Sequence, residues 1–133
     1  MSGASDYLEV NFLNHVLRQT SYASPSSIYV ALFTADPTDA NITANELSDS
    51  GYARQNATGK FDAPHATDGY CTNNAALTFP AIADGSVTIT HVGIYDAASG
   101  GNLLLSQALT NSKTLAVNDV LSFGVGSLKV TMS

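Results

Sequence analysis

From about residue 27 onward the chain is a succession of short β-type segments, which turn residues separate at intervals of about ten residues. No stretch of helical periodicity lies between these segments. Parallel strands need long crossover connections, usually helices, so this spacing excludes a parallel α/β fold. Strands that follow one another through short turns form antiparallel sheets. Seven or eight of them predict a β-sandwich or a barrel.

The predicted strands differ in the number of faces that they bury. Residues 28–33 are apolar on both faces and rich in β-forming residues, which predicts a central strand. Residues 127–132 alternate polar and apolar side chains, which predicts a strand with one buried face. The other predicted strands are residues 75–79, 87–95, 103–109, 113–117 and 120–123, with residues 51–56 as a short possible strand.

One region of this pattern predicts a β-hairpin with an irregular strand. The apolar face changes parity between residues 87–90 and 91–95, which predicts a bulge or bend near His91 or Gly93. Residues 96–102 are rich in turn-forming types, and Gly100 and Gly101 can adopt the positive φ angles of a hairpin turn.

The N-terminal region predicts the single α-helix, at about residues 6–20. Asp6 is expected to cap it, and Glu9 completes a capping-box pattern three residues later. Pro25 limits how far the helix can extend, because proline disfavours helical geometry in the residue before it. The helix carries an apolar stripe, which we expect to pack on the protein's own core; docking on a neighbouring subunit is the alternative. The stripe consists of Leu8, Phe12, Leu13, Val16 and Leu17.

Composition limits the partners of this chain. Its 133 residues suit one domain, residues 1–133, and 12% of them are charged, with a net charge of −6. Five scattered cations cannot neutralise a row of phosphates, so we expect no nucleic acid partner. The apolar runs are far shorter than the roughly 20 residues of a membrane span, so we expect no membrane partner. The first residues lack a secretory signal pattern, and we expect synthesis in the cytoplasm.

No pattern in the sequence predicts catalysis, a cofactor or a metal site. We expect His15 to be solvated and His91 to be a half-buried side chain with a satisfied hydrogen bond. His65 lies between two carboxylates in residues 62–68, which permits a metal site, but no recognised ligand spacing matches and an ordinary polar loop is the favoured interpretation. Cys71 is expected to be a small buried or half-buried thiol. Residues 124–127 hold a fragment of a glycine motif and predict a turn.

Arg54 is singled out because cations are so few. A guanidinium can form a bidentate pair with an aspartate or with a backbone carbonyl. We expect a structural role or a role between subunits in preference to substrate binding.

Several segments together resemble a family of small structural proteins of tailed bacteriophages, whose members are usually labelled tail fibre proteins. The resemblance covers nearly the whole chain. Two departures are residues 85–89, where relatives often carry a Trp-Gly pair, and residues 41–49, which replace a more glycine-rich loop. The segments that carry it are SDYLE at 5–9, IYVALFTADPTD at 28–39, GYARQ at 51–55, LTFP at 77–80 and THVGIYDAASGGNLL at 90–104.

The resemblance implies a virion protein without enzymatic activity. A compact domain of this length has a radius of gyration of about 14 Å and no repeating shaft, which favours a capsid decoration or cement protein over a fibre. We therefore expect a jelly-roll-like antiparallel β-sandwich with one N-terminal helix. Its expected partners are the major capsid protein and copies of itself, as a trimer at the capsid surface. The alternative is a tail fibre or tail-tip adhesin that binds host surface glycans.

Overall fold

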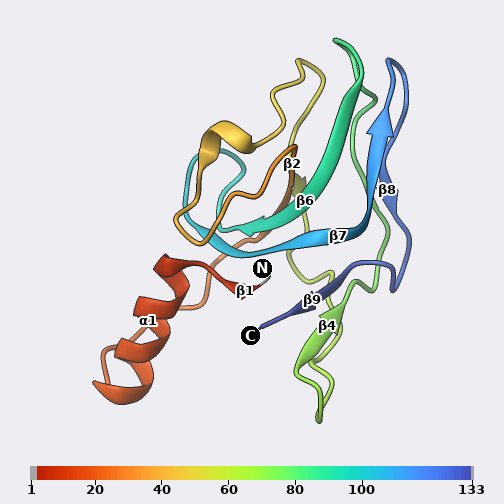
Figure 1. Ribbon diagram of the computed structural model, residues 1–133. Coiled ribbons are helices and arrows are strands. Elements are labelled where there is room, and N and C mark those ends of the chain that lie inside the picture. The colour runs from red at the N-terminus through yellow and green to blue at the C-terminus, as the bar shows by residue number, and fades with distance from the viewer. Residues whose placement is uncertain (1–2, 133) are drawn as a thin grey trace.

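The computed structural model describes residues 3–132. Within that range it contains nine β-strands, one α-helix and one short 3-10 helix (Figure 1). None of the described helices is long and apolar enough to cross a membrane. In chain order the elements are β1 (Gly3–Ala4), α1 (Asp6–Leu17), β2 (Tyr29–Phe33), η1 (Thr43–Asn45), β3 (Gln55–Asn56), β4 (Tyr70–Thr72), β5 (Leu77–Thr78), β6 (Val87–Tyr95), β7 (Leu103–Leu115), β8 (Ser122–Phe123) and β9 (Lys129–Thr131).

Five strands form the main antiparallel sheet, in the order β1-β7-β6-β2-β3. β2 lies inside this sheet, with β3 on one side and β6 on the other. Its last four residues, Val30 to Phe33, are buried on both faces of the sheet. The expected central strand is therefore confirmed. Its register with β6 runs from Tyr29 opposite Tyr95 to Phe33 opposite His91.

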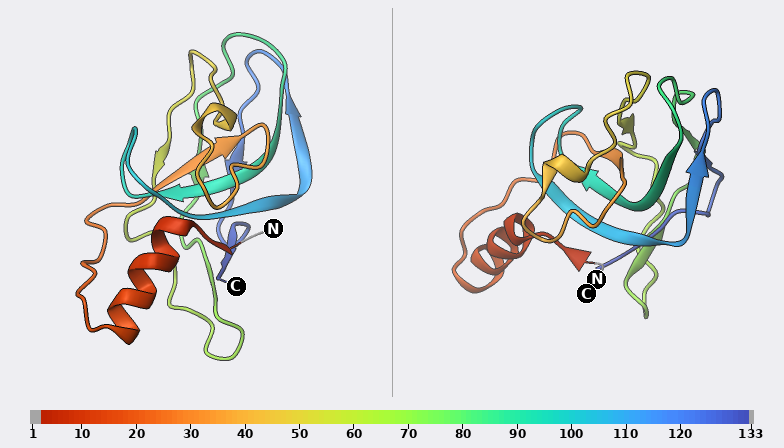
Figure 2. Two further views of the ribbon diagram at one scale, coloured as in Figure 1. Left: turned by 60° about the vertical axis from the view of Figure 1, so that its left-hand side comes forward. Right: turned by 45° about the horizontal axis from the view of Figure 1, so that its top comes forward.

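β6 and β7 form a long hairpin with an irregular register. The turn between them contains Gly100 and Gly101, whose φ angles are 61° and 71°, as expected. His91 pairs with Ala108 but Ile89 pairs with Lys113, so β7 has several extra residues opposite one extra residue of β6. This confirms the bulge expected near His91. The bulge bends β7, which remains one strand where the sequence predicted two (Figures 1 and 2).

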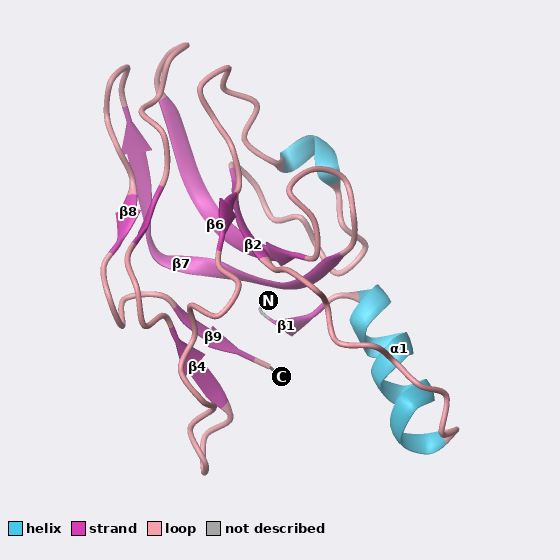
Figure 3. Ribbon diagram, turned by 180° about the vertical axis from the view of Figure 1, so that it is seen from behind, coloured by secondary structure: helices cyan, strands magenta, loops and turns pink. Residues whose placement is uncertain are grey.

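The remaining strands form two short antiparallel pairs, β4 with β9 and β5 with β8 (Figure 3). β4 was not predicted, and β5 and β8 are shorter than the strands predicted there. Asn73, which follows β4 and is fully buried, connects the pairs through its side chain. Its Nδ2 donates to the carbonyls of Ala75 and Gly124 at 2.9 Å each, and its Oδ1 accepts the Leu128 N–H at 2.9 Å. Side-chain bonds therefore replace a continuous strand ladder in this region.

The main sheet and the short pairs contribute to one buried apolar cluster, so the mainly β, antiparallel fold with a single helix is confirmed. One five-stranded sheet with two short pairs does not confirm the jelly-roll arrangement. The cluster includes Val30, Leu32, Leu77, Phe79, Ile82, Ile89, Val92, Leu121, Phe123 and Leu128.

α1 differs from its prediction in three ways. Ser5 caps it instead of Asp6, because the Ser5 hydroxyl accepts the Leu8 N–H at 3.2 Å. The helix ends at Leu17, earlier than the expected residue 20. None of its residues is buried, so the expectation that its stripe packs on the protein's own core is wrong. The helix instead projects from the edge of the sheet (Figures 1 and 2).

Candidate interaction surfaces

The outward side of α1 is apolar. Of the predicted stripe, only Leu8 packs partly against the core. The other four stripe residues and Val10 are between 47% and 69% exposed. Monomeric proteins rarely leave such a group of apolar side chains in contact with water unless another molecule covers it. We call this surface the α1 apolar face; it consists of Val10, Phe12, Leu13, Val16 and Leu17.

The inward side of α1 is the more polar one. The segment after the helix returns beside it, and there Tyr22 contacts Tyr7 ring to edge, with centroids 6.2 Å apart. His15 is exposed, as expected, and its Nδ1 accepts the Tyr22 N–H at 3.2 Å. Asn11 and Asn14 lie on the partly buried side. The sequence stripe was correct as a helical face, but the structure turns that face outward.

Three carboxylates gather at the first turn of α1. Oxygen atoms of Asp6, Glu9 and Asp39 lie within 4.8 Å of one another, and all three side chains are solvent-accessible. The backbone brings Asp39 there, because the Asp6 N–H donates to the Asp39 carbonyl at 2.9 Å. The positive end of the helix dipole offsets part of this charge. Among residues 3–132, none of the three forms an ion pair.

Arg54 is the centre of a buried polar cluster, which we call the Arg54 cluster. Its guanidinium forms a bidentate pair with Glu46, with Nε to Oε2 at 2.8 Å and Nη2 to Oε1 at 2.9 Å. Its Nη1 donates to the carbonyls of Ala97 and Gly100 at 2.9 Å each. The same guanidinium lies over the Tyr95 ring, 3.6 Å from its centroid. The expected structural role is therefore confirmed.

Two tyrosines, Tyr52 and Tyr95, complete the Arg54 cluster, and burial raises the pKa of each. The Tyr52 hydroxyl donates to Glu46 Oε2 at 2.6 Å, and burial, followed by this hydrogen bond, raises the pKa of Tyr52. Burial and then the charge of Glu46 raise the pKa of Tyr95 to about 12. Both phenols therefore stay protonated at neutral pH. The cluster fixes the turn between β6 and β7 against the loop that contains Glu46.

Three loops are tied together at the end of the molecule that lies opposite α1 (Figure 1). The Asp49 carboxylate accepts the N–H groups of Ala83, Asp84 and Gly51 at 2.8–2.9 Å. These backbone hydrogen bonds, with Ala83 first, lower the pKa of Asp49. The third loop joins through Asn118, whose N–H donates to the Ile82 carbonyl at 2.8 Å.

The histidines and the cysteine lie apart from one another. His91 is half-buried, and its Nδ1 is 2.8 Å from the Thr90 hydroxyl, as expected for a satisfied side chain. His65 is exposed and stacks on Tyr70, and only Asp68 of its two neighbouring carboxylates lies close, at 3.2 Å. Cys71 is half-buried in β4, as expected. The structure brings none of these groups together into a site.

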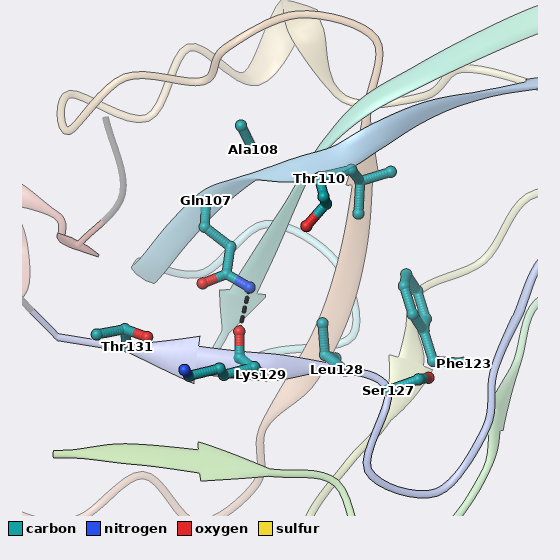
Figure 4. Close-up of a pocket in the computed structure, with 9 residues that line it drawn as sticks. Gln107, Ala108, Thr110, Phe123, Ser127, Leu128, Lys129 and Thr131 are labelled. Carbon is teal, nitrogen blue, oxygen red and sulfur yellow. Dashed lines mark hydrogen bonds between the residues drawn. The ribbon is translucent and has the colours of Figure 1, made fainter. Parts of the chain in front are cut away.

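A shallow groove runs between β7 and the segment that contains β8 and β9 (Figure 4). Its volume is about 390 Å³. Leu128 and Phe123 line one side, and Gln107 reaches across it to donate its Nε2 hydrogen to the Lys129 carbonyl. The expected turn at residues 124–127 closes one end, with the Ser127 N–H donating to the Gly124 carbonyl at 3.0 Å. The groove is lined by both polar and apolar residues, with Lys129 as its charged residue.

Comparison with known protein families decides the class. Residues 3–131 match the model of the family described as Podophage GP4 fiber I protein gp80. The chain belongs to this family. It is therefore a structural protein of a bacteriophage virion, and the resemblance found in the sequence is confirmed at that level. No curated protein matches the chain.

For this gp80-family member, the sequence missed features that depend on contacts between distant segments. Asp39 joins the carboxylates of α1, Asn73 joins β8 to β9, and Asp49 joins two loops. Periodicity and turn chemistry describe one segment at a time, so none of these contacts had a signal. The exposure of α1 had a signal in the sequence: the helix is apolar, and residues 3–132 contain no second α-helix on which its stripe could pack.

Proposed function

We propose that this protein is a subunit of a fibre on the phage particle and that it acts by binding, without catalysis. The observation that carries the proposal is the family match over residues 3–131, since the family is described as a fibre protein. The geometry supports it, because the α1 apolar face is suited to contact with another protein subunit and not with water.

The arrangement of the molecule suggests how such a subunit is oriented. α1 projects at one end, and the three loops joined by Asp49 and Asn118 lie at the opposite end (Figure 1). An apolar helix face suits a permanent contact, whereas the loop end suits a solvated surface, because most of its residues are polar or glycine and its exposed large apolar side chains are Val117 and Val120. We propose that the α1 end lies within the assembly and that the loop end faces away from it.

Labelling of intact particles tests the location. Antibody fragments against the loop end, coupled to gold, are expected to mark the tail. Quantitative mass spectrometry of purified particles is expected to give a small number of copies, on the scale of a dozen or a few dozen. Label spread over the capsid, with hundreds of copies per particle, would contradict the fibre location.

Capsid decoration is the second candidate. The residues described form one compact body without a repeating shaft, and only 12% of the chain is charged, which suits dense packing among copies on a shell. Its partners would then be the major capsid protein and copies of itself, for example as a trimer. Hundreds of copies per particle, together with binding of the purified protein to empty capsids, would support this candidate over the first.

Binding to host surface glycans is a separate property, which would allow a fibre subunit to attach the particle to its host. The groove in Figure 4 offers the hydrogen-bonding groups of Gln107, Thr110 and Ser127 beside the apolar Phe123 and Leu128, as sugar sites do. Binding of the purified protein to host envelope polysaccharide, measured by calorimetry, tests it. Thr110→Val, in the groove, is expected to weaken such binding, and Thr114→Val, on the same strand outside it, is not.

A further inference from the structure

We infer that the groove beside β7 binds an internal stretch of a linear polysaccharide and holds it without cleaving it. This inference deepens the proposed function, because it rests on the groove as a glycan site and names the kind of glycan. It depends on three features of the groove: its length, the polar side chains that β7 presents to it, and the chemistry of its lining residues.

The groove continues along β7 beyond the part that Figure 4 shows. The cavity drawn there has a volume of about 390 Å³, and a second cavity of about 280 Å³ joins it. Together they follow β7 from Gln107 to Lys113, a stretch that would span about 20 Å if it were fully extended. One chain can therefore pass from the first cavity into the second. The residues that line both cavities are Leu109, Thr110, Phe123 and Ser127.

β7 presents unused hydrogen-bonding groups to this groove. Thr110 and Asn111 are exposed, and neither side chain forms a hydrogen bond with another of residues 3–132. Figure 4 shows the Thr110 hydroxyl on the side of β7 that faces β9. Gln107 donates one amide hydrogen to the Lys129 carbonyl, which leaves its second amide hydrogen for a ligand. With half-buried Leu109 beside them, these groups match sugar units, which present both hydroxyl groups and apolar C–H surfaces.

An extended peptide is the other ligand that a groove beside a strand edge accepts. Such a peptide pairs through backbone N–H and C=O groups at regular spacing. β7 interrupts this spacing inside the groove, because residues 109–112 lie opposite Thr90 alone at the bulge. The side chains of β7 are therefore better placed than its backbone to hold a ligand, which favours a polysaccharide over a peptide.

The chemistry of the lining residues favours binding without cleavage. Hydrolysis of a glycosidic bond ordinarily uses two carboxyl groups, one as the acid and one as the base or nucleophile. Among the described residues that line the two cavities, none is aspartate or glutamate, and the charged ones are Lys113 and Lys129. A bound polysaccharide is therefore expected to stay intact, so that binding attaches the particle to the polysaccharide.

Calorimetry with the purified full chain and sized fragments tests the inference. The probe is the envelope polysaccharide of the phage's host, partly hydrolysed with acid and separated by length. The affinity is expected to rise more than tenfold from the disaccharide to the long fragments and then to level off, because a chain in both cavities makes two sets of contacts at once. Borohydride reduction of the chain ends is expected to leave the affinity for long fragments unchanged. Fragment lengths are expected to stay the same after prolonged incubation.

Two matched variants connect the length dependence to the groove. Asn111 lines the second cavity and not the first. Asn111→Ala is expected to weaken the binding of long fragments about fivefold, as the loss of one hydrogen bond does, and to leave the disaccharide, which fits in the first cavity, unaffected. The control Asn74→Ala makes the same change at an exposed residue outside both cavities, and we expect it to bind as the unchanged protein does. Circular dichroism checks that each variant retains the fold.

Several results would overturn the inference. Equal affinity for short and long fragments, a requirement for unreduced chain ends, or no binding at any length would each exclude an internal stretch of polysaccharide as the ligand. Fragments that become shorter during incubation would exclude binding without cleavage. None of these results bears on where the protein lies on the particle, because the labelling experiment decides that location separately.

Discussion

The β-body and α1 place similar residue types in opposite environments. In the body, the charged Arg54 and the polar Asn73 are buried, and among residues 3–132 every buried side-chain polar atom has a hydrogen-bond partner. In α1, leucine, valine and phenylalanine side chains are exposed to solvent. The body therefore satisfies its buried polar groups internally, whereas α1 leaves its apolar side chains exposed. The difference shows that residue type alone does not predict whether a side chain is buried or exposed.

The largest expected effect on stability comes from Arg54, whose buried charge is paired within the β-body. Arg54→Ala leaves the Glu46 carboxylate without its charge partner and removes the contact with Tyr95. The Arg54 side chain is only 5% exposed, so we expect a loss of about 3–5 kcal/mol in the free energy of unfolding. Urea denaturation measures it. Arg18→Ala, on exposed α1, is expected to change that free energy by less than about 0.5 kcal/mol, and equal losses would erase the contrast.

The next effect concerns the buried amide that connects the short strand pairs. Asn73→Ala removes the amide's hydrogen bonds to the Ala75 and Gly124 carbonyls and leaves the buried Leu128 N–H without its side-chain acceptor. We expect a loss of about 2 kcal/mol in the free energy of unfolding. The control is Asn74→Ala, since Asn74 is adjacent and exposed. If both variants unfold at the same urea concentration, the amide does not connect the pairs.

A smaller effect appears as a dependence of stability on pH. The hydrogen bonds from Ala83, Asp84 and Gly51 lower the pKa of Asp49 in the folded protein. Its contribution is therefore full above the pKa of the unfolded carboxyl, about 3.9, and is lost as the pH falls below that value toward the lower folded pKa. Urea midpoints between pH 7 and pH 2.5 are expected to fall less steeply for Asp49→Asn than for the unchanged protein. Parallel curves would contradict the assignment.

The smallest effect is expected in α1. Leu17→Ser removes an apolar side chain that is 69% exposed, so the free energy of unfolding of the dilute monomer should change by less than about 0.5 kcal/mol. Thermal unfolding at low protein concentration measures it. A loss as large as that of Arg54→Ala would mean that the α1 apolar face is covered by the protein's own chain, and the contrast between the two regions would fail.

The parts of the fold that one segment determines by itself could be predicted from the sequence. The apolar run ending at Phe33 gave a central strand, the glycines at 100 and 101 gave the hairpin turn, and the parity change gave the bulge. β7 was divided into two predicted strands because its polar middle reads as a turn. In the structure the bulge carries that middle around a bend without ending the strand.

The candidate surfaces could be predicted only in part. The apolar stripe of α1 follows from periodicity, but its direction depends on how the chain leaves β1, which no local pattern encodes. Arg54 was recognised because cations are rare, whereas its partner Glu46 was not, because the pair forms only when two loops meet. Asp6 and Glu9 have the spacing of a capping box, whereas Ser5, which caps the helix, is followed three residues later by Leu8 and so lacks that pattern.

Ser5 also has a mechanical consequence. Its buried hydroxyl accepts the Leu8 N–H and donates to the Leu103 carbonyl, so one side chain begins the helix and fastens it to β7. Its backbone N–H adds a bond to the Leu104 carbonyl at 2.9 Å. These hydrogen bonds fix the orientation of the helix relative to the sheet. A molecule that bound α1 would therefore lose little free energy in restricting the motion of the helix. The Ser5 hydroxyl therefore determines the orientation that any molecule bound to α1 would have relative to the β-body.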